Sequence, residues 1–543
     1  MIFKNPLDLI NNSFLFLKKK CRSLYLNSST YNKKISSSNN NFLEYRPSPN
    51  LLDCLIKYDK KRIKIENYSL NEIWNNKNLK EKDHNNLNSF FWLFSLDLKS
   101  SKKDTHFIII QWIEKNYNYN SKSWKIDIIA KRVIAWISNS KLTYEEGDLD
   151  YKKRFNDVVK KQINHVINEI EKSEWVDDKM IGCAAIILSG LSYKDEDGYL
   201  DFGLNLLKKI IKFSFDNDGF PKSRNIRKLK FYLKYFVLIR EWLKESQTEI
   251  PEYIDENIYY LGQAYAFIWQ NNKKDILFNG NHETKNIEFD QYLEKLGYKF
   301  KNQGNELGGY AILKNKKISL IMDIGSSPEK KFSSNYQAGS LSFEIISNGK
   351  KLICNSGYFQ NFNHKLNELS KSSAIHSTLI LNDRSSCKFK KTSNNHSKIS
   401  QNLRVLKKNI IFEKNYWKIN ASHDGYLKEY GVIHDREIEF YPEQIKFIGH
   451  DKIIFKNSFK MLKFEIRFHL EPKVKVMKTQ DNKSILIEID GEGWKLNSNN
   501  NDINIDNGLY FGKKNSFTKN QNMFISGMTN NQNHTIKWEL TKL

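Results

Sequence analysis

Hydrophobic periodicity changes once along the chain, and this change predicts two structural halves. From about residue 85 to about residue 285, apolar side chains recur at three- and four-residue steps, which is the spacing of amphipathic helices. Short polar turns separate the helical segments. These segments are 88–94, 107–112, 126–136, 158–170, 180–188, 204–213 and 229–243. We therefore expect an all-α domain built from stacked helix pairs.

After about residue 304 the pattern becomes alternating and rich in β-branched residues, with Asn and Gly between the runs. Such short alternating runs are typical of strands in an antiparallel β-sandwich. The runs are 311–313, 318–323, 341–346, 351–354, 377–381, 405–412, 417–421, 432–441, 444–448, 464–470 and 485–489. The expected fold is thus a helical half followed by an antiparallel sandwich.

A hairpin is the clearest local feature of the β half. The runs 341–346 and 351–354 flank Ser347-Asn348-Gly349-Lys350, and Asn-Gly between two strand-like runs is a strong hairpin signal. A polar loop of roughly fifteen to twenty residues follows, longer than most connections in compact domains. Polar residues that gather at strand ends often form sites. Here they are Asn335, Tyr336 and Gln337 at the hairpin entry, Asn355 and Tyr358 at its exit, and His376 before the run 377–381.

The same segment resembles the core signature of the heparinase II/III-like polysaccharide lyases, in a bacterial branch. That signature reads H-x-H-x-D-x-L-S-F, then a D-x-G turn, then A-A-H-N-T-L. Leu341-Ser342-Phe343, Asn355-Ser356-Gly357 and Ala374-Ile375-His376-Ser377-Thr378-Leu379 stand at these three places in the same order. The resemblance implies an incomplete (α/α) toroid at 85–300 and a β-sandwich at 301–543. A basic extension at 1–84 precedes them, with a Ser/Asn/Lys-rich linker at 31–41.

Lyases of this kind break a uronate chain by β-elimination. The resemblance implies the same reaction for this protein. One group must neutralise the uronate carboxylate, a base must take the C5 proton, and an acid must protonate the leaving oxygen. Asn, Gln, Arg or protonated His suit the first role because they donate hydrogen bonds to developing negative charge. His or Tyr suits the other two. The candidate catalytic residues are His376, Gln337, Arg224, Asn225 and Tyr358, and Asn335, Tyr336 and Asn355 are candidates for substrate binding.

A turn in the helical half supplies two of these candidates. The block 218–225 resembles the family's D-G-G-H-x-x-R-S-P-x-Y, with Pro221 at the histidine position and Arg224 retained. We expect Arg224 and Asn225 to line an anion-binding cleft. The alternative is a helix-entry turn in which Asn225 is the N-cap and Arg224 is solvated or pairs with a structural acid.

The metal ligands of zinc-bearing relatives are replaced in this chain. Gln337, Gly339 and Asn355 stand where the family has a histidine and two aspartates, and His376 remains. Neutral amides are weak zinc ligands, so we predict no metal and no cofactor. The alternative for His376 is a hydrogen-bonded histidine at a strand start.

Three further candidates for substrate contact carry weaker signals. Arg467 and His469 alternate with Phe468 and therefore share one face of a strand. That face looks either into the cleft or to solvent. Trp136, like most tryptophans of the helical half, is either a core aromatic or a platform on which a sugar stacks.

Charge and the terminus affect the expected partners and location. The chain has 543 residues and a formal net charge of +25. This charge favours polyanionic partners, namely nucleic acid, acidic lipid or an acidic polysaccharide, although the lysines are spread widely and also fit a solvated surface. No nucleic-acid motif is present, and five cysteines without a CxxC indicate neither a disulfide framework nor a cysteine zinc site. The first residues form no clear signal peptide, and no run of 18 apolar residues occurs. This favours the cytoplasm, whereas the resemblance implies the periplasm or cell envelope.

The sequence supports two main functions. The first is a lyase that cleaves an acidic, uronate-containing polysaccharide. The alternative is a non-catalytic acidic-glycan-binding or cell-envelope biogenesis protein that has lost the usual catalytic residues. A basic protein that binds nucleic acid or a membrane surface, for which a short amphipathic N-terminal helix is a candidate, is a third possibility. The sequence gives no oligomeric state.

Overall fold

The computed structural model describes most of the chain. The described residues are 6–36, 41–55, 74, 79–95, 102–194, 198–270, 274–284, 287–302, 304–392, 396–456, 460–498, 501–530 and 532–543. They divide into two compact units. Unit 1 comprises 1–213 and 234–255, and unit 2 comprises 214–233 and 256–543. Part of the expected extension at 1–84 lies outside the described residues.

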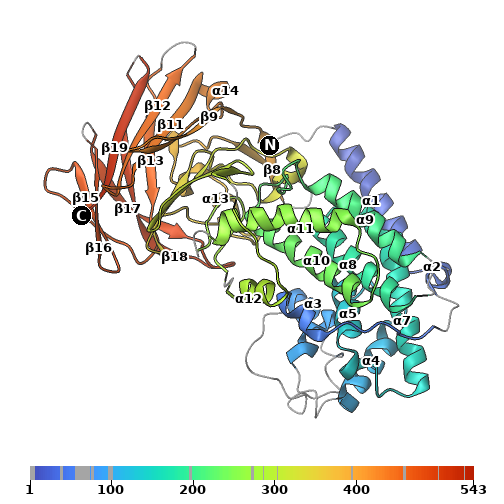
Figure 1. The fold of residues 1–543 in the computed structure, drawn as a ribbon. Helices are drawn as coiled ribbons and strands as arrows, with labels where there is room; N and C mark the ends of the chain where they lie inside the picture. Colours follow the sequence, from blue (N-terminus) through green and yellow to red (C-terminus); the bar gives the residue numbers. More distant parts are fainter. Residues whose placement is uncertain are drawn as a thin grey trace. The chain divides into compact units, whose positions relative to one another are not determined.

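Unit 1 is helical, as the apolar spacing predicts. Its main helices are α1 (Pro6–Leu26), α2 (Ser29–Lys34), α3 (Glu81–Ser89), α4 (Lys102–Asn116), α5 (Ile126–Ser138), α7 (Leu149–Glu169), α8 (Val176–Ser192) and α9 (Tyr199–Ser214). α10 (Ile226–Glu245) and α11 (Glu252–Tyr265) each span both units. α5 packs against α7 and α8, side by side in Figure 1. Most residues of α5 are buried, including Arg132, which agrees with its largely apolar sequence.

Two details of unit 1 differ from the expectation. Residues 29–34 form α2 instead of a linker, because Tyr31 and Ile35 are buried there and Ser28 caps the helix. The expected helix at 88–94 does not form either. α3 ends at Ser89, and Phe90 has a left-handed backbone (φ 58°) that separates it from a short 3₁₀ turn, Phe91–Ser95. The apolar run there fills a core of stacked aromatic rings rather than one helix face.

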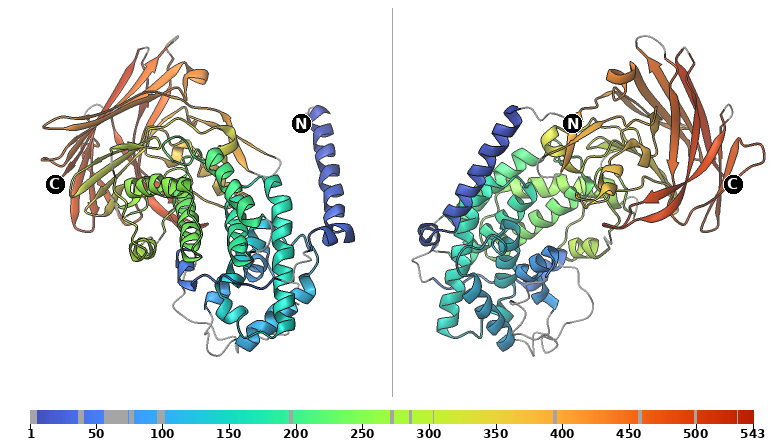
Figure 2. Two further views of the ribbon diagram at one scale, coloured as in Figure 1. Left: turned by 45° about the vertical axis from the view of Figure 1, so that its right-hand side comes forward. Right: turned by 180° about the vertical axis from the view of Figure 1, so that it is seen from behind.

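Unit 2 contains four antiparallel sheets among the described residues. The orders are β1-β2-β3-β4-β5, β14-β15-β16-β19-β12-β11-β10-β9, β17-β18-β13-β6, and β7-β8. The strands of the first sheet are β1 (Glu306–Leu307), β2 (Tyr310–Lys314), β3 (Ile318–Asp323), β4 (Phe343–Ser347) and β5 (Lys350–Ile353). The long central strands of the eight-stranded sheet, β11 (Val432–Tyr441), β12 (Lys446–Phe455) and β19 (His534–Lys542), run side by side in Figure 2.

The remaining strands complete the second, third and fourth sheets. They are β6 (Leu379–Leu381), β7 (Lys388–Lys391), β8 (Ser397–Gln401), β9 (Val405–Phe412), β10 (Trp417–His423), β13 (Lys463–His469), β14 (Lys475–Lys478), β15 (Ser484–Ile489), β16 (Glu492–Asn497), β17 (Ile503–Tyr510) and β18 (Thr518–Met528). One apolar core joins the three larger sheets, with Phe343, Ile419 and Phe464 among its buried members. The antiparallel sandwich predicted from the alternating runs is therefore confirmed.

The hairpin also forms as predicted. β4 pairs with β5, and the turn residues Asn348 and Gly349 have φ values of 46° and 74°, the left-handed backbone of a type I′ turn. The expected third strand differs. β6 has only three residues and pairs with β13, in another sheet than the hairpin. The loop before it holds the short helix α13 (Lys365–Leu369) and a 3₁₀ turn.

Candidate functional site

The fold of unit 2 brings together the polar residues at the hairpin ends. We call this group the hairpin site and define it as Asn225, Asn335, Gln337, Asn355, Tyr358 and His376. Each of these side chains contacts the backbone or an amide of another chain segment, and most are fully buried. The site is thus a buried polar network. Buried polar groups usually have hydrogen-bond partners, so the few groups here that lack one are the candidates for contact with a ligand.

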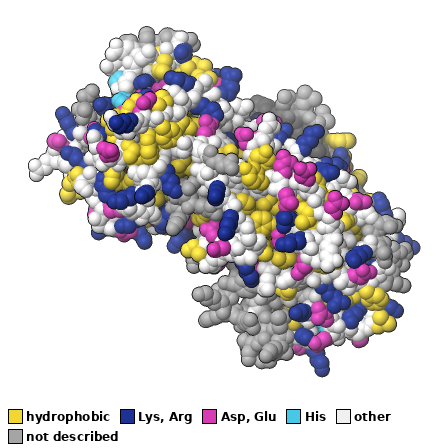
Figure 3. Space-filling model, viewed as in Figure 1, with side chains coloured by type: hydrophobic (Ala, Val, Ile, Leu, Met, Phe, Trp, Pro, Cys, Tyr) yellow, Lys and Arg dark blue, Asp and Glu magenta, His cyan; other side chains and the backbone are white. Residues whose placement is uncertain are grey.

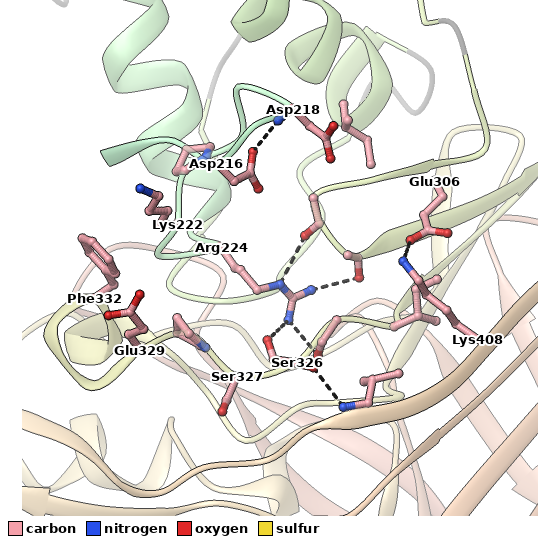
Figure 4. Close-up of a pocket in the computed structure, with 18 of the residues that line it drawn as sticks. Asp216, Asp218, Lys222, Arg224, Glu306, Ser326, Ser327, Glu329, Phe332 and Lys408 are labelled. Carbon is pink, nitrogen blue, oxygen red and sulfur yellow. Dashed lines mark hydrogen bonds and ion pairs between the residues drawn. The ribbon is translucent and has the colours of Figure 1, made fainter. Parts of the chain in front are cut away.

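Arg224 lies next to the site and ties several loops together. Its Nη2 donates to Asp323 Oδ1 at 2.8 Å and to the Gly309 carbonyl at 2.9 Å, and Nε donates to the Gly308 carbonyl at 3.2 Å. Nη1 donates to the carbonyls of Gly325 and Ser326 (Figure 4). Burial acts to lower the pKa of Arg224, but the Asp323 carboxylate outweighs it and keeps the guanidinium charged. Every N–H donor of the guanidinium is used. In this conformation Arg224 therefore pairs with a structural acid, Asp323, which is the alternative stated for it from the sequence.

Asn225 begins α10 and leaves one donor without a partner. Its Oδ1 accepts a hydrogen bond from the Arg227 N–H at 3.0 Å, which is the N-cap interaction. Its Nδ2 is buried and has no hydrogen-bond partner. The cap fixes the amide, and Nδ2 lies against the backbone of Gly280. A Cβ atom on Gly280 would lie 2.6 Å from Nδ2 and 3.0 Å from the Asn335 Cβ.

This geometry predicts that Gly280→Ala lowers the free energy of unfolding by about 2–4 kcal/mol. Gly280 has a φ of +85°, and the added methyl group would also collide with Asn225 and Asn335. The matched control is Gly349→Ala, which has a φ of +74° but no atom within 4 Å of the new Cβ. Its cost should be the backbone term alone, about 1–2 kcal/mol. Equal losses in denaturant titrations of both variants would contradict the close packing around Asn225.

Tyr358 links the hairpin exit to its entry. Its hydroxyl donates to Asn335 Oδ1 at 3.3 Å and accepts from Asn367 Nδ2 at 3.1 Å. Burial raises the pKa of Tyr358 to about 12, although the Asn367 hydrogen bond and the charge of Arg227 act in the opposite direction. The phenol therefore keeps its proton at neutral pH. Tyr336, the neighbour of Asn335, instead packs in a small core with Cys387.

Gln337 and Asn355 use their amides to hold the backbone. Gln337 Oε1 accepts from the Gly280 N–H at 2.9 Å, and its Nε2 donates to the carbonyls of Gly357 and Ser370. Asn355 Oδ1 accepts from the Ser377 N–H at 3.0 Å. Both amides therefore act as crosslinks between loops.

His376 has a defined tautomer. Its Nδ1 lies 2.8 Å from the Ser372 carbonyl oxygen, and because a carbonyl only accepts, Nδ1 carries the proton. Nε2 is then a bare lone pair, buried and without a partner. Burial lowers the pKa of His376 to about 4, against the hydrogen bond to Ser372, which acts to raise it. A Cβ on Gly339 would lie 2.9 Å from this Nε2, so no side chain fits at 339 with the ring in this position.

The zinc site that the family resemblance raises does not fit these residues. The amide oxygens of Gln337 and Asn355 already accept backbone N–H groups. Among the described residues, no group of three or more His, Cys, Asp or Glu side chains is arranged to hold a metal ion.

The other candidates lie away from the hairpin site or within its supporting structure. Arg467 pairs with Glu465 and Asp506. His469 Nε2 donates to the Ala374 carbonyl at 3.0 Å, and its Nδ1 accepts from the Ser356 hydroxyl at 3.1 Å. These bonds, together with its burial, give His469 a supporting role under the loop that carries His376. Trp136 is buried in the aromatic core of unit 1 beside Phe90 and has no exposed face for a sugar.

Several residues that complete the network carried little signal in the sequence. Asn279 donates to the Tyr310 hydroxyl at 2.7 Å and to Asp323 Oδ2 at 3.0 Å. Glu344 accepts from the backbone N–H groups of Leu277 and Asn355, both at 2.9 Å. The Asn-Gly pair at 279–280 resembles an ordinary turn, so its contacts follow only from tertiary structure. Glu344 within an apolar strand was the one visible hint of a buried polar network.

A groove with a volume of about 770 Å³ opens beside Arg224 (Figure 4). Its charged lining is mixed. Asp216 accepts the N–H groups of Asp218 and Phe220, and Glu306 pairs with Lys408. Phe332 adds one aromatic side chain to the lining. The groove can thus accommodate a polar chain, but its carboxylates are engaged in turns and ion pairs.

A helical unit and a unit of antiparallel sheets define the class of fold, an (α/α) toroid with a β-sandwich. Residues 304–539 match the family model described as "Heparinase II/III-like, C-terminal". The C-terminal part of this chain is a heparinase II/III-like domain, and the family resemblance seen in the sequence is confirmed.

Solved structures agree on the fold across most of the chain. The heparan sulfate lyase HepC from Pedobacter heparinus is 14% identical, with a TM-score of 0.65, covering 86% of this chain and 78% of that one. A structure described as the heparinase III BT4657 gene product is also 14% identical, with a TM-score of 0.67 and coverage of 87% and 80%. A further heparinase III is 13% identical, with a TM-score of 0.66 and coverage of 95% and 88%. Among curated proteins, none matches the sequence.

Proposed function

We propose that this protein binds a uronate-containing acidic polysaccharide at the hairpin site and cleaves it by β-elimination. The observation that carries the proposal is the Asn225 amide, whose Nδ2 is a buried donor without a partner at the N-terminus of α10. A donor in this position, reinforced by the positive end of a 20-residue helix, suits a carboxylate. Neutralising the uronate carboxylate is what makes the C5 proton acidic enough to remove.

The remaining roles fall on His376 and Tyr358. His376 has a bare lone pair on Nε2 and can accept the C5 proton. The C–H electron pair then forms the C4–C5 double bond while the C4–O bond breaks. Tyr358 keeps its proton at neutral pH and can donate it to the leaving oxygen. Both side chains are buried, so the reaction requires a local opening of the loop that carries His376.

A specific observation favours the second function, binding of an acidic glycan without cleavage. Tyr358 is 0% exposed and His376 is 1% exposed, and the amides that replace the family's ionisable residues crosslink the backbone. A site that is used only for binding has no need for accessible acid and base groups.

The deciding experiment follows the ultraviolet absorbance of the unsaturated uronate product with a panel of acidic glycans. We expect product from the wild type, a loss in kcat of about 10²–10³-fold for Asn225→Ala, and of about 10²–10⁴-fold for Tyr358→Phe. His376→Ala should behave like Tyr358→Phe. The matched controls Asn361→Ala and Tyr259→Phe change exposed residues of the same types and should retain activity.

Two results would separate the candidate functions. No product on any glycan, with binding that Asn225→Ala weakens, would support the binding protein and contradict the lyase. Product that survives in all three variants would contradict the assignment of these residues.

A further inference from the structure

α1 carries an apolar stripe on its solvent-exposed side. Phe14, Leu17 and Leu24 are 66%, 58% and 67% exposed, and Tyr25 is 46% exposed. Cys21, also exposed, continues the stripe. The spacing of three, four and three residues from 14 to 24 places these side chains on one face of the helix. Such a continuous exposed apolar face is unusual unless it contacts something.

The opposite side of α1 is fixed to the rest of unit 1. Arg22 forms an ion pair with Glu169 at the end of α7, and Leu26 is buried. Tyr25, at one border of the stripe, contacts the ring of Tyr31 in α2. Figures 1 and 2 show α1, in blue, along the outside of the helical unit. The apolar stripe is therefore turned outward by contacts on the other face.

Lysines border the stripe on both sides. At about 100° per residue, Lys18 falls beside Phe14 and Tyr25, and Lys20 falls beside Leu17 and Leu24. Both lysines are exposed. Apolar side chains flanked by lysines are the pattern of helices that lie in the interface of an anionic membrane, where the chains insert and the lysines reach the headgroups. An apolar patch that contacts another protein has no need for cations along both borders.

Charge on the one face drawn in Figure 3 is not separated by sign. On the face shown in Figure 3, Lys and Arg side chains are interspersed with Asp and Glu. The net charge of +25 adds a general attraction to anionic surfaces, but α1 alone among the described helices combines cations with an exposed apolar stripe. No described helix is long and apolar enough to cross a membrane.

We propose that the outward face of α1 binds the surface of anionic membranes, with Phe14, Leu17 and Leu24 inserted among the lipids and Lys18 and Lys20 on the headgroups. This role is independent of the glycan chemistry of unit 2. It places a polysaccharide-active fold at a membrane surface.

The test is sedimentation of the full-length protein with vesicles. We expect binding to vesicles of phosphatidylglycerol and phosphatidylcholine, and at least about tenfold weaker binding to phosphatidylcholine alone. Leu17→Ser/Leu24→Ser should weaken binding to the anionic vesicles by about tenfold or more. Lys18→Gln/Lys20→Gln should weaken it by about tenfold at low salt and less at high salt.

Matched controls keep the result specific to α1. Leu149→Ser removes an exposed leucine from α7, and Lys103→Gln/Lys153→Gln removes two exposed lysines from other helices. Neither control should change binding more than about twofold. Circular dichroism of each variant confirms that it folds.

Three outcomes would overturn the proposal. The first is no binding by the wild type, and the second is equal effects of the controls and the α1 variants. The third is concentration-dependent dimerisation that Leu17→Ser/Leu24→Ser abolishes, without vesicle binding, since it would assign the stripe to contact between copies of the chain.

Discussion

Replacement of Asp451 by Asn is expected to lower the free energy of unfolding by about 3–5 kcal/mol. Asp451 Oδ1 accepts hydrogen bonds from His434 Nε2 and Arg436 Nε, each at 2.7 Å, and Oδ2 accepts from Trp538 Nε1 at 3.0 Å. All four side chains are fully buried. The substitution would leave the Arg436 guanidinium in the core without a counter-charge, which costs more than a lost hydrogen bond.

The network around Asp451 also supports the hairpin site. Arg436 Nη1 donates to the carbonyls of Leu341, at 2.7 Å, and Ser377, at 2.8 Å. These residues precede β4 and follow His376. Loss of Asp451 should therefore loosen the loop that carries His376 as well as the core of the sandwich.

The same network predicts a dependence of stability on pH. Burial acts to raise the pKa of Asp451, but Arg436 and His434 outweigh it and hold the pKa well below the usual value for an aspartate. A depressed native pKa means that the unfolded state binds the proton more readily. The stabilisation is then complete above about pH 5 and decreases as the pH falls through the unfolded carboxyl pKa of about 4.

Denaturant titrations at about pH 7 and about pH 3 measure both effects. We expect the difference in the free energy of unfolding between wild type and Asp451→Asn to be smaller at the lower pH. The reason is that the wild type loses part of the stabilisation by the Asp451 carboxylate there. Asp383→Asn is the matched control, since that carboxylate is exposed and pairs with Lys463. A change below about 1 kcal/mol for Asp451→Asn would show that the network is not coupled to folding.

Arg224→Ala is the second large change, with an expected loss of about 3–5 kcal/mol in the free energy of unfolding. The substitution would leave Asp323 buried without its cation. It would also leave the carbonyls of Gly309 and Gly325 without their donors. Glycine is required at both positions, because a Cβ would lie 2.8 Å from Arg224 Nη2 at Gly309 and 2.4 Å from it at Gly325.

Arg404→Ala provides the comparison for Arg224→Ala. Arg404 also pairs with an aspartate, Asp424, but its side chain is 76% exposed, so its loss should cost less than about 1 kcal/mol. Thermal unfolding of the two variants and of Arg224→Lys separates the roles. Lysine keeps the charge but cannot donate to so many carbonyls at once. Similar midpoints for Arg224→Ala and wild type would mean that Arg224 is free to act on a substrate.

The fold was predictable where runs of β-branched and aromatic residues lie between turn residues. The runs 318–323, 405–412 and 432–441 coincide with β3, β9 and β11. The Asn348-Gly349 turn set the register of the hairpin, since only certain residues adopt its backbone readily. We predicted no helix at the position of α11, because its apolar residues are interspersed with many acidic residues and tyrosines.

The site was predictable only in part. Sequence order predicted that Asn335 and Tyr358 lie close together because they flank a hairpin, and a hydrogen bond joins their side chains. The partners that fix them were not visible. Asn225 contacts Gly280, and Gln337 accepts a hydrogen bond from the Gly280 N–H. Both contacts join residues that are 55 or more positions apart in the sequence, so no local pattern predicts them. We expected Arg224 to line an anion-binding cleft, but it pairs with Asp323. The sequence shows Asp323 only as the end of a strand, so this pair was not predictable.

The short segment 214–233 belongs to unit 2, although it lies far upstream of the sheets in the sequence. A gene fragment that starts where the family model begins, at residue 304, would encode every strand but neither Arg224 nor Asn225. Such a fragment would contain a buried aspartate, Asp323, without its cation, and the proposed glycan site would lack the Asn225 amide. The sandwich is therefore not a transferable module by itself. We expect a stable form of this unit to include the segment 214–233 together with the sheets.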